Sequence, residues 1–147
     1  MTKIASCRRA GIKTKSFNIV GFPLETPEIA RETIELNARI NPDSVIVGIF
    51  EPYPGTKLAE VCRREGFVDA AREDNDFIGR TDTILNMPKF PRAEILRIFR
   101  NFGYLVYRRH SLKKAWSYRI YYSPLGEIIL RLLSPLKALI RRLTMGV

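Results

Sequence analysis

The sequence predicts a mixed α/β fold in which one βαβ unit is followed by a helical carboxyl-terminal segment. Two apolar runs, 15–20 and 44–50, have the β-branched and aromatic composition of strands. Apolar residues recur at helical spacing between these runs, and helical patterns dominate from residue 92 onward. A strand, a helix and a second strand in this order are the basic unit of a parallel sheet.

The first predicted strand leads into the most informative junction of the chain. The apolar run of 15–20 stops at Gly21, crosses a proline turn and passes Glu25 before Thr26 and Pro27 open a helix. In parallel α/β folds such junctions lie at the carboxyl ends of the strands, where ligands bind. We therefore expect a functional site at this end of the sheet.

The predicted helix that follows begins at Pro27, a residue favoured at the first helical position. It ends at Asn41-Pro42, and its apolar spacing is carried by Ile29, Thr33, Leu36 and Ile40. The next run, 44–50, is almost continuously apolar, which is typical of a strand buried on both faces of a parallel sheet.

A second junction repeats the first. The segment Glu51-Pro52-Tyr53-Pro54-Gly55-Thr56 follows the second strand and precedes a predicted helix at 57–65 that Gly66 ends. Because both junctions place a glutamate in a proline-containing loop after a strand, Glu25 and Glu51 are expected to project toward the same rim. The alternative is that both are solvated loop acids.

The outer parts of the chain give simpler patterns. Residues 3–10 are expected to be a helix that Gly11 ends. From 67 to 91 the chain is polar and irregular, and a calcium-binding loop starting at Asp74 is excluded because Leu85 would fill its bidentate position. A helix is predicted at 92–109, with inward-facing Ile95, Leu96, Phe99, Phe102 and Val106.

Composition and charge restrict the classes of protein that fit. The chain has 147 residues and a net charge of +10, and its basicity is concentrated in 103–147, where Glu127 is the single acid. Cys7 and Cys62 are too far apart in sequence for a thiol metal site and are expected to be buried or half-buried structural thiols. No apolar run approaches the ~20 residues of a membrane span, and no secretory leader is visible, so we expect a cytoplasmic protein with possible peripheral membrane contact.

Two patterns in the carboxyl-terminal part leave alternatives open. Residues 104–122 interleave cations with aromatic side chains, which fits either RNA binding or a helix that packs its aromatic residues inward, and His110 is expected to be exposed there. Residues 125–143 form an amphipathic stretch with cations, broken by Pro135, that fits partner docking or an anionic membrane surface. Two alternative interpretations therefore stay open. The first is a small basic protein that binds a membrane surface or docks on a partner through 125–147. The second is an RNA-binding module, with nucleic acid the less favoured partner.

Four segments in order carry a resemblance to a known family: Gly11-Ile12-Lys13-Thr14-Lys15, then 18–26 (Asn-Ile-Val-Gly-Phe-Pro-Leu-Glu-Thr), then Asn41-Pro42-Asp43-Ser44, then Pro52-Tyr53-Pro54-Gly55-Thr56. Together they resemble the radical S-adenosylmethionine superfamily, over roughly residues 8–67. The resemblance is to the branch that often carries a cobalamin-binding domain, and the helix at 89–109 is similar to that branch's carboxyl-terminal extension.

The resemblance implies that the chain is a βαβ fragment of a partial TIM-type barrel followed by an α-helical carboxyl-terminal extension. In this superfamily a Cys-x-x-x-Cys-x-x-Cys triad holds a [4Fe-4S] cluster that cleaves S-adenosylmethionine reductively to a 5′-deoxyadenosyl radical. The two predicted strands match the fifth and sixth barrel strands, whose loops hold the adenosyl group, and the branch implies cobalamin as a further cofactor. The cofactor-binding residues carried over are Gly21, Phe22, Pro23, Glu25, Thr26, Phe50 and Glu51.

Two departures from the family pattern affect this expectation. Leu24 stands where the family usually has glycine, so a positive φ at this position would be costly. The cysteine triad and the first four strands are absent, so we expect the chain not to catalyse alone and to need the missing amino-terminal barrel half or a partner that supplies it. The expected division is a barrel portion at 1–67, an irregular surface connection at 68–90 and a basic helical extension at 91–147.

Overall fold

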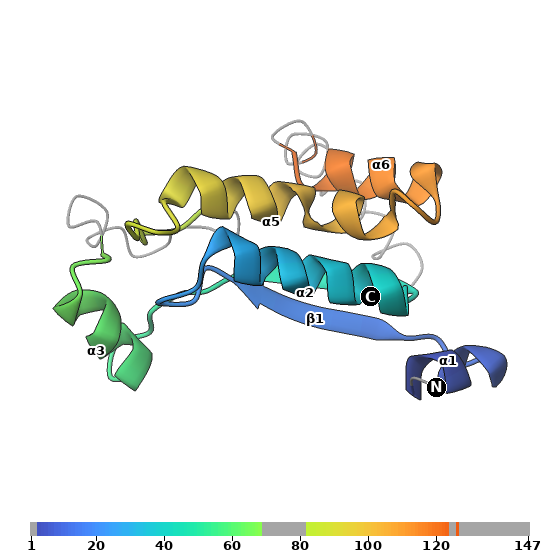
Figure 1. Cartoon of the computed structure of the whole chain (residues 1–147), viewed down its shortest axis with the longest axis horizontal. Helices are drawn as coiled ribbons and strands as arrows, with labels where there is room; N and C mark the ends of the chain where they lie inside the picture. Colours follow the sequence, from blue (N-terminus) through green and yellow to red (C-terminus); the bar gives the residue numbers. More distant parts are fainter. Residues whose placement is uncertain (1–2, 69–81, 124–125, 127–147) are drawn as a thin grey trace, which may run out of the picture.

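The computed structural model describes residues 3–68, 82–123 and 126 and has a mixed α/β architecture (Figure 1). A two-stranded parallel sheet, β1 (Lys15–Val20) and β2 (Ser44–Ile49), is accompanied by five helices in this part of the chain. They are α1 (Lys3–Arg9), α2 (Pro27–Ile40), α3 (Lys57–Arg64), α5 (Arg92–Tyr107) and α6 (Leu112–Tyr121). The predicted βαβ unit followed by helices is confirmed, whereas the amphipathic stretch 125–143 lies outside the described residues.

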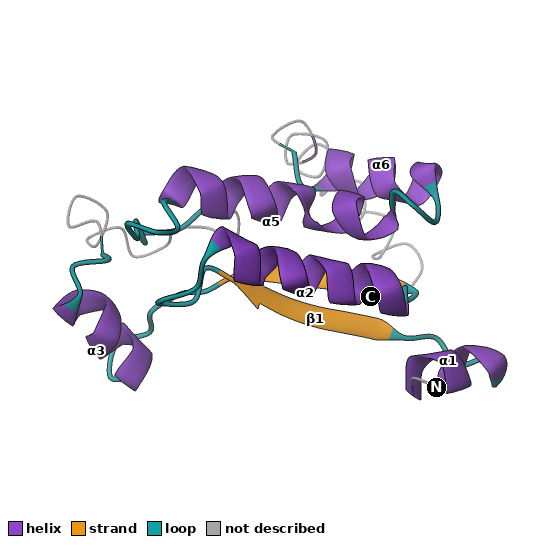
Figure 2. Cartoon of the chain, viewed as in Figure 1, coloured by secondary structure: helices purple, strands orange, loops and turns teal. Residues whose placement is uncertain are grey.

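Helices α2, α5 and α6 are layered on one side of the strands (Figure 2). Helices α2 and α5 lie side by side, α5 also packs on β2, and α6 packs on α5. Helices α1 and α3 lie at opposite ends of the molecule, next to the start of β1 and beyond the end of β2 (Figure 1). Among the described residues, no helix is long and apolar enough to cross a membrane.

The two strands pair in register from Lys15 opposite Ser44 to Val20 opposite Ile49. At the ends of this ladder Ser44 N donates to Thr14 O at 3.1 Å and Phe50 N donates to Val20 O at 2.8 Å. The even-numbered residues of β1 therefore direct their backbone groups to β2, and the odd-numbered ones direct theirs to the opposite edge. Among the described residues no strand pairs with that opposite edge of β1.

The two faces of the sheet differ in burial. Val20, Val45 and Val47 lie beneath the helices and are at most 5% exposed. On the other face Phe17 is 73% exposed and Ile46, its partner in the register, is 40% exposed. The prediction that β2 is buried on both faces is therefore wrong for the described chain, because the helices cover one face and leave the apolar side chains of the other in contact with solvent.

The outer edge of β2 is covered by helix α6. Val45 N donates to Tyr118 Oη at 3.1 Å, which satisfies a strand N–H that points away from β1. The Tyr118 ring reaches this edge because Gly103 of α5 leaves room for it: a Cβ at Gly103 would lie 2.4 Å from the ring. Within the part of the chain that the structure describes, the two edges of the sheet are therefore unlike: Tyr118 covers the edge of β2, and no strand covers that of β1.

Helix ends follow the sequence signals closely. Helices α1 and α3 both end in a glycine of positive φ, Gly11 at +72° and Gly66 at +67°. In each case the residue after the glycine donates its N–H to a carbonyl five residues back, at 2.9 Å from Ile12 and 2.8 Å from Phe67. Cys62 is buried and Cys7 is half-buried, as expected for structural thiols.

The core is built around α5, whose predicted inward residues are all buried: Ile95, Leu96, Phe99, Phe102 and Val106. The apolar spacing that predicted α2 does not mark its buried face, since Ile29 and Leu36 are each 49% exposed. Ala30, Ile34 and Asn37 are buried instead, because this side of the helix packs on the sheet and on α5.

The described part of the predicted irregular connection, residues 68 and 82–90, is not confined to the surface. Leu85, Met87 and Phe90 are at most 2% exposed and belong to the core cluster around α5. Arg92 donates to both carboxylate oxygens of Asp82 at 2.6 Å, which ties this segment to the first turn of α5. Its lack of regular structure was predicted, but its apolar residues were not recognised as core.

Candidate binding site at the carboxyl ends of the strands

The loop after β1 is a tight turn with proline at its second position. Glu25 N donates to Phe22 O at 3.0 Å, so the four residues from Phe22 to Glu25 close a β-turn. Pro23 presets its own φ, and Leu24 then has a φ of +70°. A positive φ in the position after the proline is the requirement of a type II turn, which favours glycine there. The left-handed backbone anticipated at Leu24 is therefore observed.

The Glu25 side chain folds back onto its own loop. Its Oε2 accepts from Gly21 N at 2.5 Å and from Phe22 N at 3.1 Å, so the carboxylate occupies two consecutive backbone donors. Burial raises the pKa of Glu25 above its ordinary value, and the two N–H donors oppose this change without cancelling it. In this conformation Glu25 organises the turn and keeps the Gly21 and Phe22 donors from contacting another anion.

The loop after β2 repeats this construction. Thr56 N donates to Tyr53 O at 3.3 Å, which closes a turn over Pro54 and Gly55, and Gly55 has a φ of +81°. A threonine caps the helix after each turn: Thr26, the residue after the first turn, accepts from Ile29 N, and Thr56, the last residue of the second turn, accepts from Ala59 N. The doubled junction seen in the sequence is thus a doubled structure, with leucine in one turn where the other has glycine.

The two loops meet through their aromatic residues. The rings of Phe22 and Phe50 have centroids 5.0 Å apart at an interplanar angle of 35°. Phe22 is 36% exposed, and Phe50 is half-buried. Of the predicted site residues, the structure brings together Gly21, Phe22, Glu25 and Phe50. Pro23 forms the turn, Thr26 caps α2, and Glu51 is exposed on the second loop.

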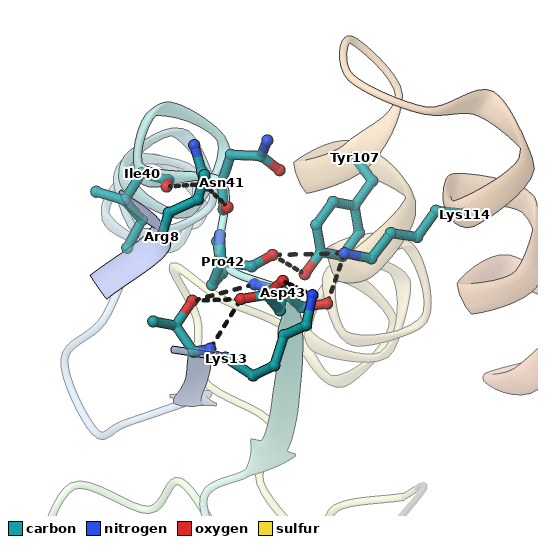
Figure 3. Close-up of polar contacts among 9 residues, drawn as sticks. Arg8, Lys13, Ile40, Asn41, Pro42, Asp43, Tyr107 and Lys114 are labelled. Atoms are coloured by element: carbon teal, nitrogen blue, oxygen red, sulfur yellow. Dashed lines mark hydrogen bonds and ion pairs between the residues drawn. The ribbon is translucent and has the colours of Figure 1, made fainter. Parts of the chain in front are cut away.

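A second polar cluster lies at the opposite, amino-terminal end of the strands (Figure 3). It surrounds the connection between α2 and β2, and sequence reasoning did not identify it. Asp43 Oδ2 accepts from Thr14 N at 2.8 Å and from Thr14 Oγ1 at 3.1 Å, and Oδ1 accepts from Lys13 Nζ at 3.2 Å. These contacts fix the starts of β1 and β2 side by side.

The carbonyl groups of the same connection accept from three other elements (Figure 3). Tyr107 Oη donates to Pro42 O at 2.9 Å, and Lys114 Nζ donates to Asp43 O at 2.6 Å. Arg8 of α1 donates to the carbonyls of Ile40 and Asn41. His110, expected to be merely exposed, lies with Nε2 2.8 Å from Ala38 O. Cations and donors thus gather where the carbonyl groups at the end of α2 carry partial negative charge.

The electrostatics of this cluster follow from its geometry. The Thr14 N–H, followed by the Lys13 ammonium, lowers the pKa of Asp43 to about 2. Burial lowers the pKa of Lys114; the Asp43 carboxylate opposes this change, and Lys13 and Arg8 add smaller contributions in the same direction as burial. The sequence signal for the cluster was the segment Asn41 to Ser44, which appeared in the family resemblance without a role.

A groove of about 390 Å³ lies between α6 and the beginning of the sheet, far from the two carboxyl-end loops. It is lined by Lys15, Ser44, Val45, Ile46, Ser117, Tyr118, Tyr121 and Tyr122. This groove and the predicted cofactor residues are therefore at different ends of the strands.

The residues present fit only part of the predicted cofactor set. A [4Fe-4S] cluster of the family type needs three cysteine thiolates, whereas the chain has two cysteines, one of them fully buried. Among the described residues no group of three or more His, Cys, Asp or Glu side chains could hold a metal ion. The Phe22–Phe50 pair beside Gly21 fits one aromatic wall for an adenosyl group.

Comparison with known proteins gives one partial match. A stretch of 50 residues, 34% of the chain, is 44% identical to the probable threonylcarbamoyladenosine tRNA methylthiotransferase of Pyrococcus horikoshii. The match spans 12% of the length of that protein. No family model matches the chain. The likeness is thus to a short portion of a much longer enzyme.

Proposed function

We propose that this chain is the carboxyl-terminal portion of a radical S-adenosylmethionine enzyme, in which it contributes the wall of the site next to the adenosyl group. Its support comes from the four sequence segments, from the partial identity to a methylthiotransferase of that superfamily and from the structure of the two loops. The cobalamin branch stays a prediction, because the partial identity does not distinguish one branch from another.

The observation that carries the proposal is the repeated loop at the carboxyl ends of two adjacent parallel strands. Both loops use an X-Pro turn with a positive φ and a threonine cap, and they meet at Phe22 and Phe50. This is the end of a parallel α/β sheet at which ligands bind. The aromatic pair would contact a flat apolar group such as adenine, while Gly21, with a φ of +84°, lets the chain turn after β1 in close contact with Ile95.

The unlike edges of the sheet support a place at the end of a larger sheet. Tyr118 closes the outer edge of β2, which fits a last strand, whereas β1 leaves an edge open to another strand. The apolar face formed by Phe17, Ile19 and Ile46 would then point into the interior of the barrel. The missing amino-terminal barrel half, or a partner that supplies it, would pair with β1.

Glu25 would set the accessibility of the adenosyl wall. Its carboxylate occupies the Gly21 and Phe22 donors, so a ligand that needs those N–H groups has to displace it. When the cluster and S-adenosylmethionine are bound in the complete enzyme, they supply the radical chemistry. The residues of this chain would bind and orient the nucleoside, and the two-cysteine chain alone would not catalyse.

The experiment is capture of the native polypeptide with an antibody to residues 125–147, followed by intact-mass spectrometry and iron and sulfide analysis. We expect either a much larger polypeptide or a complex with a chain that contains Cys-x-x-x-Cys-x-x-Cys, with iron and sulfide in both cases. An iron-free chain of 16.9 kDa without a partner would refute the proposal.

A variant pair sharpens this test. Phe17→Asp places a charge on the open face of the sheet and is expected to abolish association with the other barrel part. Leu112→Asp, which changes an exposed residue of α6 instead, is expected to leave association intact. If both variants lost association equally, or if neither lost it, the result would count against β1 as the edge that pairs with the other barrel part.

A further inference from the structure

The outward side of α6 carries an apolar row of three side chains. Leu112, Trp116 and Ile120 are spaced four residues apart and are 63%, 53% and 48% exposed. Residues at this spacing lie on one side of a helix, so they form a row about 12 Å long. Lys114 and Tyr118 lie on the opposite side of α6 and contact the rest of the fold, since Lys114 Nζ donates to Asp43 O and Tyr118 Oη accepts from Val45 N. The row therefore points away from the core.

Cations flank this row on both sides. At 100° per residue, Lys113 and Arg119 lie on opposite sides of the line through Leu112, Trp116 and Ile120. Arg108 and Arg109 are exposed in the preceding connection, and residues 103–123 contain neither Asp nor Glu. The Arg119 guanidinium lies 5.7 Å from the centroid of the Tyr104 ring, and the Trp116 ring meets the same tyrosine edge-on at 5.6 Å. The row is thus an apolar strip flanked by cations, on a segment of the chain that contains no acidic residue.

We propose that the outer face of α6 binds the surface of anionic lipid membranes. An amphipathic helix that lies in the membrane interface buries apolar side chains at the boundary of the acyl chains and places its cations against lipid phosphates. Tryptophan is favoured at this depth because its ring is apolar and its N–H is polar. The row and its flanking cations have this arrangement on a helix whose other side is held by α5.

Charge and side-chain type favour a membrane over RNA as the partner. Stacking on nucleic acid bases uses aromatic rings, whereas Leu112 and Ile120 have no ring and gain by leaving water for an apolar phase. The proposal is independent of the radical S-adenosylmethionine proposal and does not use residues 125–147, for which membrane contact was predicted.

Trp116 is the single tryptophan of the chain, so its fluorescence reports on this face alone. The full-length protein is titrated with vesicles of phosphatidylcholine, with vesicles of phosphatidylcholine and phosphatidylglycerol at about 7:3, and with single-stranded RNA. We expect a blue shift with the anionic vesicles only, and quenching when those vesicles contain brominated acyl chains. Both effects should weaken as salt is added.

The variant that tests the row is Leu112→Gln/Ile120→Gln, which keeps Trp116 as the probe. Its apparent partition into anionic vesicles is expected to fall by about tenfold or more, because two apolar side chains are removed. The matched control is Ile29→Gln/Leu36→Gln, which changes two exposed apolar residues on α2 and is expected to partition like the wild type.

Three results would overturn the proposal. One is co-sedimentation with vesicles without any change in Trp116 emission, which would assign binding to another part of the chain. A second is emission that is already blue-shifted and insensitive to vesicles, which would show that the row is covered by the protein itself. The third is a response to RNA and none to anionic vesicles.

Discussion

The Lys114 ammonium lies 3.7 Å from the centroid of the Tyr107 ring, and both residues donate to the carbonyl of Pro42. One carbonyl of the connection between α2 and β2 thus receives a hydroxyl from α5 and a cation from α6. The cation also stacks on the ring that supplies the hydroxyl, an interaction worth about 0.5–2 kcal/mol in proteins. Through this pair the helical segment fixes the amino-terminal end of the sheet, opposite the candidate site.

Tyr107→Phe removes the hydroxyl while keeping the ring. Because Tyr107 is fully buried and Oη donates to Pro42 O at 2.9 Å, we expect the free energy of unfolding to fall by about 1 kcal/mol. Urea denaturation followed by circular dichroism measures this change. Tyr121→Phe, at a residue 54% exposed, is the control and should be neutral. An equal loss of unfolding free energy in the two variants would show that the hydrogen bond to Pro42 O stabilises the fold no more than the hydroxyl of an exposed tyrosine does.

Leu24→Gly is expected to stabilise the fold. Leu24 has a φ of +70° and is 70% exposed, so the variant relieves a left-handed backbone that costs a non-glycine residue about 1–2 kcal/mol while losing little packing. Glycine is more flexible in the unfolded chain, which offsets roughly 0.5–1 kcal/mol of this gain. The net increase should be small but measurable as a higher midpoint of urea denaturation.

The reciprocal control for Leu24→Gly is Gly55→Leu in the matching turn, where φ is +81° and a Cβ meets nothing within 4 Å. This variant should be less stable than the wild type. A loss of stability in Leu24→Gly would instead show that the leucine side chain holds its turn.

The elements around the site could be predicted from the sequence because their signals are local. Helix ends at Gly11 and Gly66, caps at Thr26 and Thr56, and the turn strain at Leu24 each depend on a few consecutive residues. The direction of the Glu25 side chain could not be predicted in this way. A carboxylate four residues after a glycine can point outward or bond to the N–H groups of its own turn, and only the folded loop shows that two such donors are within reach.

The contacts that the sequence did not reveal join residues far apart in the chain. Tyr107 and Pro42 are separated by 65 positions, and Lys114 and Asp43 by 71, so no periodic pattern records their contact. The exposed apolar face of β2 was missed for a related reason. A nearly continuous apolar run predicts burial on both faces, but how many faces are covered depends on the neighbouring elements, of which the described chain supplies one side.

Gly103→Ala is expected to destabilise the packing of α6 on α5. Alanine favours a helix over glycine by about 1 kcal/mol, but its Cβ would lie 2.4 Å from the Tyr118 ring, and overpacking of this kind costs typically 1–3 kcal/mol. We expect a net loss of stability in thermal denaturation. The loss should be smaller in a Tyr118→Ala background, where the ring is removed and only the Cβ of residue 118, at 2.8 Å, remains close.

Gly48→Ala is the control for Gly103→Ala, since a Cβ at Gly48 meets nothing within 4 Å. This variant should stay close to the wild type. If Gly103→Ala were more stable than the wild type, the close approach of Tyr118 to α5 would be disproved.

The lowered pKa of Asp43 predicts how the stability of the fold changes at acid pH. The Thr14 and Lys13 donors lower its pKa from 3.8 in the unfolded chain to about 2 in the fold. A carboxyl whose pKa is lower in the folded state stabilises the fold fully above the unfolded value, and this contribution is lost as the pH falls from about 4 to about 2. Glu25 acts oppositely and at higher pH, because burial raises its pKa and the folded state takes up its proton more readily.

Asp43→Asn isolates this contribution. The melting temperature of the variant should lie below that of the wild type above about pH 4, and the two should converge as the pH is lowered toward 2. Glu32→Gln, at an exposed acid on α2, serves as the control and should follow the wild-type curve. A difference between Asp43→Asn and the wild type that stays constant from pH 6 to pH 2 would contradict the prediction. In that case the Asp43 carboxylate would not be held ionised by Thr14 and Lys13, and its role at the strand ends would be steric.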